Sequence, residues 1–561
     1  MTPSAGPDPT PPSPLQTPHA GRTPAADDDT GALAPLRQPV FRMLWVTWLT
    51  ANVCMWMNDV AAAWLMTSLT TSPVMVALVQ SASTLPVFLL GLPSGALADI
   101  LDRRRYFIVT QFWVAAVALL VCVVVLSDGM SAPLLLALTF ANGMGLAMRW
   151  PVFAALVPEL VPRPQLPAAL ALNGVSMNAS RIIGPLVAGA VIASFGSAYV
   201  FVLNAVLSVV CGFVIRRWQR EQKPRALPGE RFFGAMRVGV QHVRQSQRMH
   251  AVLLRISLFF LQASALQALL PLLAKRMDGG GAGTFTLLLA GLGVGAIAAA
   301  LYLPRLRGLM TRDQLVQRGS LVQAAATVVV AFSPNVYLAL PVMVIAGMAW
   351  ISVANSLTVS AQLALPDWVR ARGMSIYQMA LMGSSAMGAA LWGQVASLSD
   401  LRTALVGSAL FGLVAVVAAR RVTLEGVGEE DLTPSHSIKS PPTAEPVDPD
   451  AGPVLVTIEY RIDPAHAVEF RAVMEETRRA RLRQGALSWE LFRDTADPSR
   501  YIEYLLDESW VDHLRRFDRF TAADDALRAR RLRFHIGDQP PLVTRCIAQP
   551  VDARRASPQE S

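Results

Sequence analysis

Residues 173–196, N-G-V-S-M-N-A-S-R-I-I-G-P-L-V-A-G-A-V-I-A-S-F-G, decide how we interpret this sequence. They lie in an apolar run long enough to cross a lipid bilayer, which takes about 20 residues. Pro185 lacks the amide donor of the helix ladder and predicts a bend, while Gly184 and Gly189 let a neighbouring helix approach closely. Arg181, near the middle of the run, is a cation that is costly to bury in a membrane. The stretch therefore predicts a membrane helix with a functional role.

The whole chain has the composition of a polytopic membrane protein. Of its 561 residues, 53% are hydrophobic and 16% are charged, whereas soluble domains carry about 25% charged residues. Twelve apolar runs of near-spanning length predict an all-helical membrane region of two six-helix halves. The runs are 41–65, 74–98, 107–126, 133–150, 166–194, 198–215, 251–273, 284–303, 315–332, 336–359, 374–396 and 403–419.

The arginines predict how these runs are oriented. They gather in the loops after even-numbered runs, so the positive-inside rule places both termini and the long central loop in the cytoplasm, as in a multi-pass protein of a bacterial inner membrane. This clustering also explains the formal charge of +9, and we expect no nucleic-acid partner. Four scattered cysteines lack the spacing of metal ligands, so we expect neither a metal nor a cofactor.

The expected domains follow from these patterns and from composition. They are a disordered tail (1–39), a six-helix half (40–217), a cytoplasmic central loop (218–250), a second half (251–421), a flexible acidic linker (422–452), a soluble domain (453–549) and a tail (550–561).

An internal repeat supports two related halves. Pro162, Gly184 and Gly189 recur as Pro366, Gly388 and Gly393, each at an offset of 204. Gly143 and Gly347 fall on the same offset. Parallel halves with a binding site near the bilayer midplane between them are a transporter architecture.

The soluble segment after the linker has its own pattern of elements. We expect strands at 454–462, 486–493, 501–506 and 542–547, and helices at 464–484 and 509–520, the second continued to 534. The order β-α-β-β-α-β predicts an α+β ferredoxin-like unit, which can form a homodimer by pairing its open sheet face. One interpretation of His513 and His535 is a proton-handling pair; we favour two solvated surface histidines, which are the commoner case.

Asp59 and Arg181 are the ionisable residues expected inside spans of the first half. A carboxylate in a membrane cavity can take up and release a proton, so this pair is a candidate for coupling transport to protons. The alternative is a fixed ion pair or a polar cap at a helix end, and the sequence leaves both open.

The segment G-A-L-A-D-I-L-D-R-R-R, residues 95–105, ends the second run. Gly95 permits close helix packing, and Asp99 can pair with cations or cap a helix end. Arg103 and Arg104 hold the loop inside. We expect these four residues, together with Gly184, Pro185, Gly189, Gly388 and Gly393, to serve gating and helix packing.

These motifs together resemble a known transporter family. Residues 95–105 resemble the loop motif G-x-x-x-D-R-x-G-R-R of the major facilitator superfamily, with Ile100 and Asp102 departing from it. S-R-I-I-G-P-L-V-A-G resembles the antiporter motif of that superfamily's exporters, and V-A-A-A-W-L, L-P-S-G-A-L-A-D and V-P-E-L-V-P resemble the branch of the enterobactin exporter. The resemblance implies a twelve-helix exporter of siderophores or hydrophobic drugs.

The C-terminal stretch E-S-W-V-D-H-L-R-R-F-D-R-F-T-A-A-D resembles a domain similar to the cofactor-free antibiotic-biosynthesis monooxygenase fold, a dimeric α+β barrel. No catalytic signature carries across, and we assign no catalytic residue.

Three functions are compatible with the sequence. We favour a proton-coupled exporter whose partners are a small-molecule substrate, protons and the lipid bilayer. The alternatives are a transporter fused to an active cytoplasmic enzyme, and a membrane sensor without transport. No Walker A loop is present, which argues against direct drive by ATP.

Overall fold

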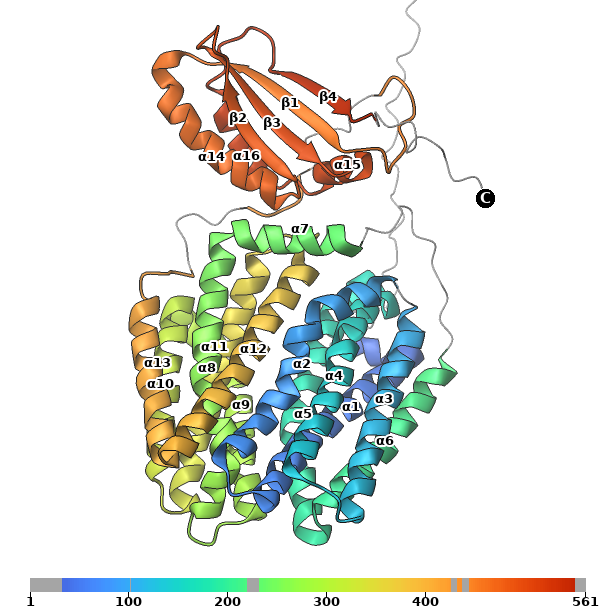
Figure 1. Ribbon diagram of the computed structural model, residues 1–561, viewed down its shortest axis with the longest axis vertical. Coiled ribbons are helices and arrows are strands. Elements are labelled where there is room, and N and C mark those ends of the chain that lie inside the picture. The colour runs from blue at the N-terminus through green and yellow to red at the C-terminus, as the bar shows by residue number, and fades with distance from the viewer. Residues whose placement is uncertain (1–32, 101, 219–231, 425–430, 436–442, 550–561) are drawn as a thin grey trace, which may run out of the picture.

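The computed structural model describes residues 33–100, 102–218, 232–424, 431–435 and 443–549. In this part of the chain, the long helices form one bundle of two groups, and a separate sheet domain lies beyond it (Figure 1). The first group is α1 (Pro39–Leu69), α2 (Pro73–Ile100), α3 (Arg103–Leu126), α4 (Ala132–Leu160), α5 (Leu166–Phe195) and α6 (Ser197–Arg217). The second is α8 (Gln247–Arg276), α9 (Ala282–Leu309), α10 (Arg312–Phe332), α11 (Val336–Leu363), α12 (Arg370–Leu398) and α13 (Leu401–Ala419).

The helices agree with the twelve expected runs, most of them extended by a few residues and α4 by ten at its C-terminal end. Within the described residues, ten of them are long and apolar enough to cross a membrane, so the chain is a multi-pass membrane protein. α1 and α12 fall outside that set. They carry buried polar residues, such as Asn52 and Asn58 on α1 and Ser384 on α12, that face other helices.

The apolar core differs between the two ends of the bundle. We call the end next to α7 the α7 end, and the opposite one the far end. At the far end, one hydrophobic cluster joins both halves, with members from Met57 on α1 to Leu405 on α13. At the α7 end each half has a cluster of its own, one around Trp48 and Phe107 and the other around Phe260. The halves are thus packed together at the far end.

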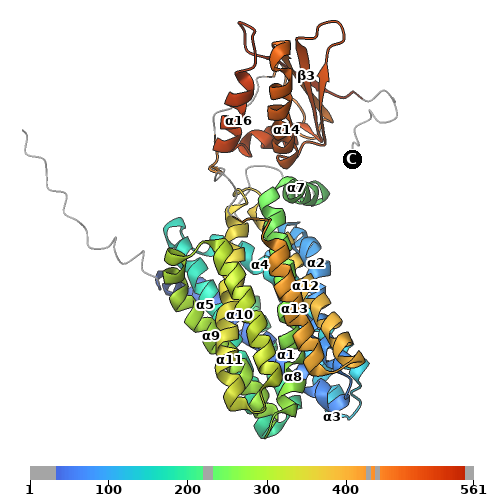
Figure 2. The same cartoon turned by 90° about the vertical axis from the view of Figure 1, so that its left-hand side faces the viewer.

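α7 (Phe232–Gln245) forms inside the segment that we expected to be a loop, and that expectation is wrong for these residues. It lies between the bundle and the sheet domain (Figures 1 and 2) and contacts helices of both halves, α2 and α12. Its buried residues face both neighbours: Val238 and His242 lie against the C-terminal domain, and Val243 belongs to the core cluster of the second half. A helix this short gives no spanning signal in the sequence.

The C-terminal domain is a four-stranded sheet covered by helices. The strands are β1 (Val454–Arg461), β2 (Ser488–Arg493), β3 (Arg500–Asp507) and β4 (Leu542–Ile547), and the helices are α14 (Ala467–Arg483), α15 (Trp510–Asp518) and α16 (Ala522–Leu532). The sheet order is β2-β3-β1-β4, with every neighbouring pair antiparallel. The expected strands and helices are confirmed to within a few residues. In the described part of the chain, α14 and α16 lie on one face of the sheet, and the other face carries no helix (Figure 2).

Part of the linker is not a free tether. Residues 431–435 lie against the C-terminal domain, where Pro434 forms a β-bridge with Thr521 and the Ser435 amide donates to the Phe520 carbonyl at 2.9 Å. The expectation of a flexible linker is therefore wrong for this piece. These contacts are with the backbone of a distant segment, which composition does not reveal.

Candidate functional site

Arg181 lies between the two halves near the middle of α5, in a cage of aromatic rings. Its guanidinium carbon is 5.1 Å from the ring centre of Trp56 on α1 and 4.1 Å from that of Trp350 on α11. The Trp350 ring in turn packs against Phe260 at 5.6 Å. Cation–π contact stabilises a desolvated guanidinium, but the Arg181 Nε and Trp56 Nε1 donors are buried and have no hydrogen-bond partner among the described residues. The site therefore presents a cation and free donors at mid-depth.

Asp59 lies elsewhere, in a small cavity between α1, α2 and α8. Its Oδ1 accepts a hydrogen bond from the Ser83 hydroxyl at 2.9 Å. Gln80 and Gln267 also line the cavity. No ion pair joins Asp59 to Arg181 in the described residues, so the fixed pair left open by the sequence is not formed here.

The repeated glycines occupy equivalent places in the two halves. A Cβ on Gly184 of α5 would overlap Trp56 of α1, and a Cβ on Gly388 of α12 would overlap Ser264 and the Leu261 backbone of α8. Both contacts join the fifth helix of a half to its first helix. The close approach predicted at Gly184 is thus within one half.

Gly189 and Gly393 instead lie at contacts between the halves. A Cβ on Gly189 of α5 would overlap Thr286 of α9, and a Cβ on Gly393 of α12 would lie 2.5 Å from the Ala77 Cβ of α2. The helix pairs are equivalent by the repeat, since each joins a fifth helix to the second helix of the other half. This agreement supports a duplicated transport unit.

The predicted gating segment is described only in part. Gly95 and Asp99 lie in the last turns of α2 and Arg103 begins α3, but the side chains of these residues lie outside what the structure describes. The Arg104 guanidinium donates to the Arg216 carbonyl of α6. The Asp102 carboxylate accepts from the Arg105 amide at 2.8 Å and caps α3, which accounts for this departure from the motif.

Arg149 on α4 is a second buried cation that sequence reasoning missed. It is 2% exposed, stacks over Trp48, and donates at 3.4 Å to the Gln111 side chain and to the Ala51 carbonyl. The expected span ended at residue 150, so this arginine looked terminal, whereas α4 continues to Leu160. A longer window across 133–160 is the signal that could have found it.

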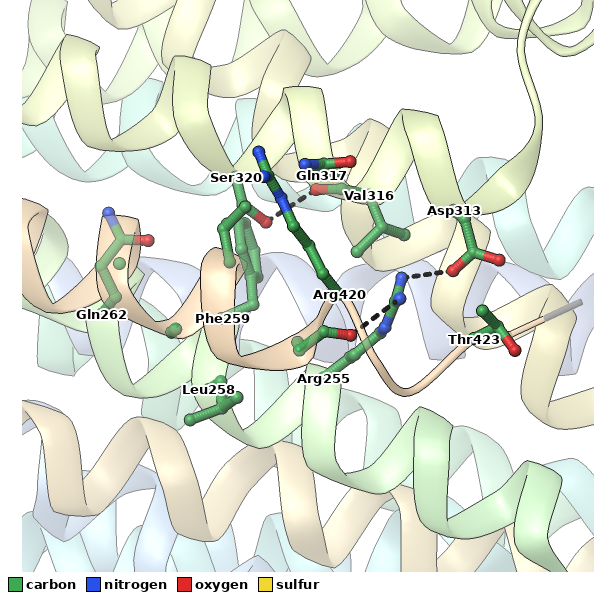
Figure 3. Close-up of a pocket in the computed structure, with 14 residues that line it drawn as sticks. Arg255, Leu258, Phe259, Gln262, Asp313, Val316, Gln317, Ser320, Arg420 and Thr423 are labelled. Carbon is green, nitrogen blue, oxygen red and sulfur yellow. Dashed lines mark hydrogen bonds and ion pairs between the residues drawn. The ribbon is translucent and has the colours of Figure 1, made fainter.

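A separate cavity of about 150 Å³ lies between α8, α10 and α13, within the second half (Figure 3). Arg255 and Asp313 form an ion pair of 2.6 Å at its mouth. Gln262 lies at its inner end and is 1% exposed, and neither of its amide atoms has a hydrogen-bond partner in the described part of the chain. Arg255 is neutralised by Asp313 and also bonds the Val422 carbonyl at 2.7 Å. The other arginine of the lining, Arg420, is exposed to solvent, so among the described residues this cavity presents no buried unpaired cation like Arg181.

The C-terminal domain buries a cluster of polar side chains around Glu503. Glu503 accepts from the Tyr460 hydroxyl at 2.8 Å, from Arg481 at 2.9 Å and from the Trp489 indole at 3.1 Å. Although burial acts to raise the pKa of Glu503, the guanidinium groups of Arg481 and Arg531 lower that pKa to about 2. All of its partners are internal, as in a structural group.

His513 is buried, and the expectation that it is solvated is wrong. It is 2% exposed, and its Nδ1 lies 2.8 Å from Asp507, which also receives Arg516 at 2.9 Å. The Arg545 Nε donates to the His513 Nε2 at 3.2 Å. Burial lowers the pKa of His513, against the opposing effect of Asp507. Both ring nitrogens are engaged, which leaves neither available to a substrate.

The C-terminal domain is docked on α7 by polar contacts. Arg237 forms an ion pair of 2.6 Å with Glu508, and the Gln241 amide donates to the Ala486 carbonyl at 2.7 Å. His242 lies 3.3 Å from the Arg483 carbonyl. Burial lowers the pKa of His242 to about 4, and the Arg483 guanidinium adds to this.

Trp368, just before α12, completes the docking surface. Its ring meets the His242 ring edge to face at 5.5 Å, and the Arg519 guanidinium of the C-terminal domain lies 4.9 Å from its centre. The domain thus contacts the segment that leads into α12, the helix that packs on α2 of the other half.

Comparison with known proteins agrees with this architecture. A family model described as "transmembrane secretion effector" matches residues 30–553. The chain is 21% identical over 253 residues to the staphyloferrin A transporter of Staphylococcus aureus, covering 45% of this chain and 63% of that protein. It is 22% identical over 237 residues to macrolide efflux protein A of Streptococcus pyogenes, covering 42% and 58%. The chain therefore matches about three-fifths of the length of these relatives.

Solved structures share the fold of the bundle. The nucleoside transporter NupG superposes with a TM-score of 0.58 at 11% identity, covering 68% of this chain and 99% of that one. A bacterial homologue of the lysosomal transporter Spinster, in an inward-facing and occupied conformation, gives 0.56 at 15% identity, covering 70% and 98%. At these identities the likeness concerns the fold alone.

Proposed function

Since the chain belongs to the transmembrane secretion effector family of the major facilitator superfamily, we propose that it is a proton-coupled exporter of small molecules. The observation that carries this proposal is Arg181, a cation at mid-depth between the two halves that has no acidic partner among the residues the structure describes. A buried charge without a partner is costly, so its retention there is best explained by a ligand. A sensor without transport would need no such site.

The cargo that fits this site bears an anion and an apolar body. Arginine binds carboxylates bidentately, and the rings of Trp56, Trp350 and Phe260 offer apolar surface beside it. The names of two relatives point to a siderophore and to macrolides. Because Arg181 repels a cationic drug, we favour a carboxylate-bearing siderophore.

The orientation follows from charge and packing. We assign the α7 end to the cytoplasm, with twelve spans and both termini inside the bacterial inner membrane, because the arginine-rich loops lie there. The shared core at the far end and the separate cores at the α7 end support a conformation open to the cytoplasm, as required for loading an exporter.

Asp59 is our candidate for proton coupling, and Gly95, Asp99, Arg103 and Arg104 for the cytoplasmic gate. Asp59 is set apart from Arg181, so that proton and cargo occupy different places. Proton binding at Asp59 and cargo binding at Arg181 are then coupled because the affinity of each site depends on how the two halves are arranged.

We propose that the C-terminal domain is a ferredoxin-like module with a structural or regulatory task. Its sheet order and antiparallel pairing support this topology, and the engaged nitrogens of His513 speak against an active monooxygenase-like enzyme. Its open sheet face carries half-buried apolar side chains, Leu455, Ile502 and Leu506 among them. A second copy of the domain is the occupant we propose for that face, giving a homodimer.

Equilibrium binding to the purified full-length protein tests the cargo site. A radiolabelled carboxylate-bearing siderophore should bind the wild type, and Arg181→Leu should weaken binding about 30-fold, equivalent to about 2 kcal/mol for a lost charged partner. Arg181→Lys should retain part of the affinity. Equal affinity of wild type and Arg181→Leu for the siderophore would contradict the proposal that Arg181 binds an anionic group of the cargo. Tighter binding of a cationic macrolide than of the siderophore by the wild type would contradict it as well.

A further inference from the structure

The cavity beside Asp59 has the size of a single ion or water. Its volume is about 20 Å³, and about 10–15 Å³ suffices for one water. It opens between α1, α2 and α8 and is separate from the Arg181 cage. A guest of this size is too small to be the cargo.

The polar lining of this cavity consists of oxygen donors. The Ser83 hydroxyl donates its hydrogen bond to Asp59 Oδ1, so its oxygen lone pairs remain available as acceptors within the cavity. The side-chain amides of Gln80 and Gln267 make no hydrogen bond within the described residues, so their carbonyl oxygens are available. Carboxylate, hydroxyl and amide oxygens are the ligands of hard cations.

The charge balance of the cavity also favours a cation. Its other lining side chains, Ala63, Val76, Val79 and Ala268, are apolar. None of the three helices brings another charged group into the lining. In the described part of the chain Asp59 has no cationic partner, and an isolated carboxylate is costly at this depth.

The two halves build this cavity together. Asp59, Gln80 and Ser83 come from the first half, and Gln267 comes from α8 of the second half. Separation of the halves at the far end would carry Gln267 away and leave the ion with three of its four ligands. An ion bound here therefore favours the arrangement in which the halves are packed at the far end.

From these observations we infer that Asp59, Ser83, Gln80 and Gln267 form a site for one monovalent cation, either a proton taken up by the Asp59 carboxylate or a sodium ion, with Gln267 as the partner supplied by the opposite half. The inference rests on the proposed transport function and deepens it, because it makes occupation of one small site depend on alternation of the halves. Cation entry from the far side would then close that side.

Thermal unfolding of the purified full-length protein, without any cargo, tests this site. A ligand that binds only the folded protein raises its melting temperature with concentration. One arm titrates sodium chloride against choline chloride at constant ionic strength and pH 8. The other lowers the pH from 8 to 6 in choline chloride. A sodium-dependent rise identifies sodium, and a rise with acid alone identifies the proton.

Variants assign the effect to the cavity. Asp59→Asn should abolish the cation-dependent rise, and Gln267→Leu should raise the half-saturating cation concentration about tenfold, with Gln267→Asn in between. Gln362→Leu, at an exposed position of α11, is the matched control and should behave as the wild type. Each variant is first compared with the wild type by size-exclusion profile.

Two results overturn the inference: no cation-dependent rise in the wild type, or a rise that persists in Asp59→Asn. An unchanged half-saturating concentration in Gln267→Leu overturns the role of the second half. Because no cargo is present, these outcomes are independent of export. If the protein exports siderophore but shows no cation-dependent rise in melting temperature, the proposed export function stands and the proposed cation site is wrong.

Discussion

Gly393 is the position at which one added carbon should drive the two halves apart. A Cβ there would lie 2.5 Å from the Ala77 Cβ and 3.3 Å from the Val74 Cα on α2. Ordinary carbon contacts need about 3.5–4.0 Å, so α2 and α12 must separate by about 1 Å in the Gly393→Ala variant. Overpacking of this kind costs about 1–3 kcal/mol. Since the contact joins the halves at the far end, this cost falls on the arrangement open at the α7 end.

We expect the equilibrium constant between the two arrangements of the halves to change by about 5- to 150-fold in favour of the one open at the far end, because about 1.4 kcal/mol corresponds to a tenfold change. Spin labels on cysteines at Asp128 and Ser399, both exposed at the far end, report the separation of the halves by electron–electron resonance. The background carries Cys546→Ser, since the other three cysteines are buried. Gly174→Ala is the control, because a Cβ there meets nothing within 4 Å. Identical distance distributions for Gly393→Ala and wild type, or an equal shift in the control, would refute the reasoning.

Four further predictions address other parts of the molecule. Gly184→Val should displace Trp56 from Arg181 and cause proton leak or loss of export in liposomes normalised to folded protein; tightly coupled transport would contradict the antiporter interpretation. Asp59→Asn should abolish export driven by a pH gradient while the protein remains folded, and unchanged export would exclude Asp59. The free energy of docking of the C-terminal domain should weaken as pH falls from about 6.5 toward 4, by about 1.4 kcal/mol at pH 5.5. The reason is that His242 regains its ordinary pKa when the domain undocks, and it then takes up a proton. Cross-linking of the domain to α7 that does not depend on pH would count against this. Residues 452–551 expressed alone should sediment as a dimer without cofactor, whereas a monomer at high concentration, or a bound flavin or haem, would oppose the proposed pairing.

The sequence was informative where a signal is local and periodic. The long helices follow from apolar runs, the strands of the C-terminal domain from alternation, and the glycine contacts from the repeat. Gly184 and Gly388, for example, were predicted as close approaches without knowledge of their partners. These features depend on residues near one another in the chain or on an exact offset.

The sequence was silent where several distant elements meet. The cage around Arg181 needs aromatic rings from α1 and α11, and nothing in the sequence near either ring predicts that it contacts Arg181. α7 is helical because it is held between two domains, and its own apolar face is too short to stand out. His513 is buried by an ion pair network from β3, α15 and β4. Such groups depend on tertiary placement, which single-sequence patterns do not carry.

Transport by the purified protein in inside-out oriented liposomes tests the central claim most directly. With an acidic lumen, a carboxylate-bearing siderophore should accumulate in the lumen while protons leave it, both processes should stop when an uncoupler removes the gradient, and Arg181→Leu should show neither. Accumulation that does not depend on the pH gradient would contradict a proton-coupled exporter. Accumulation that is undiminished in Arg181→Leu would contradict the binding of an anionic cargo to Arg181.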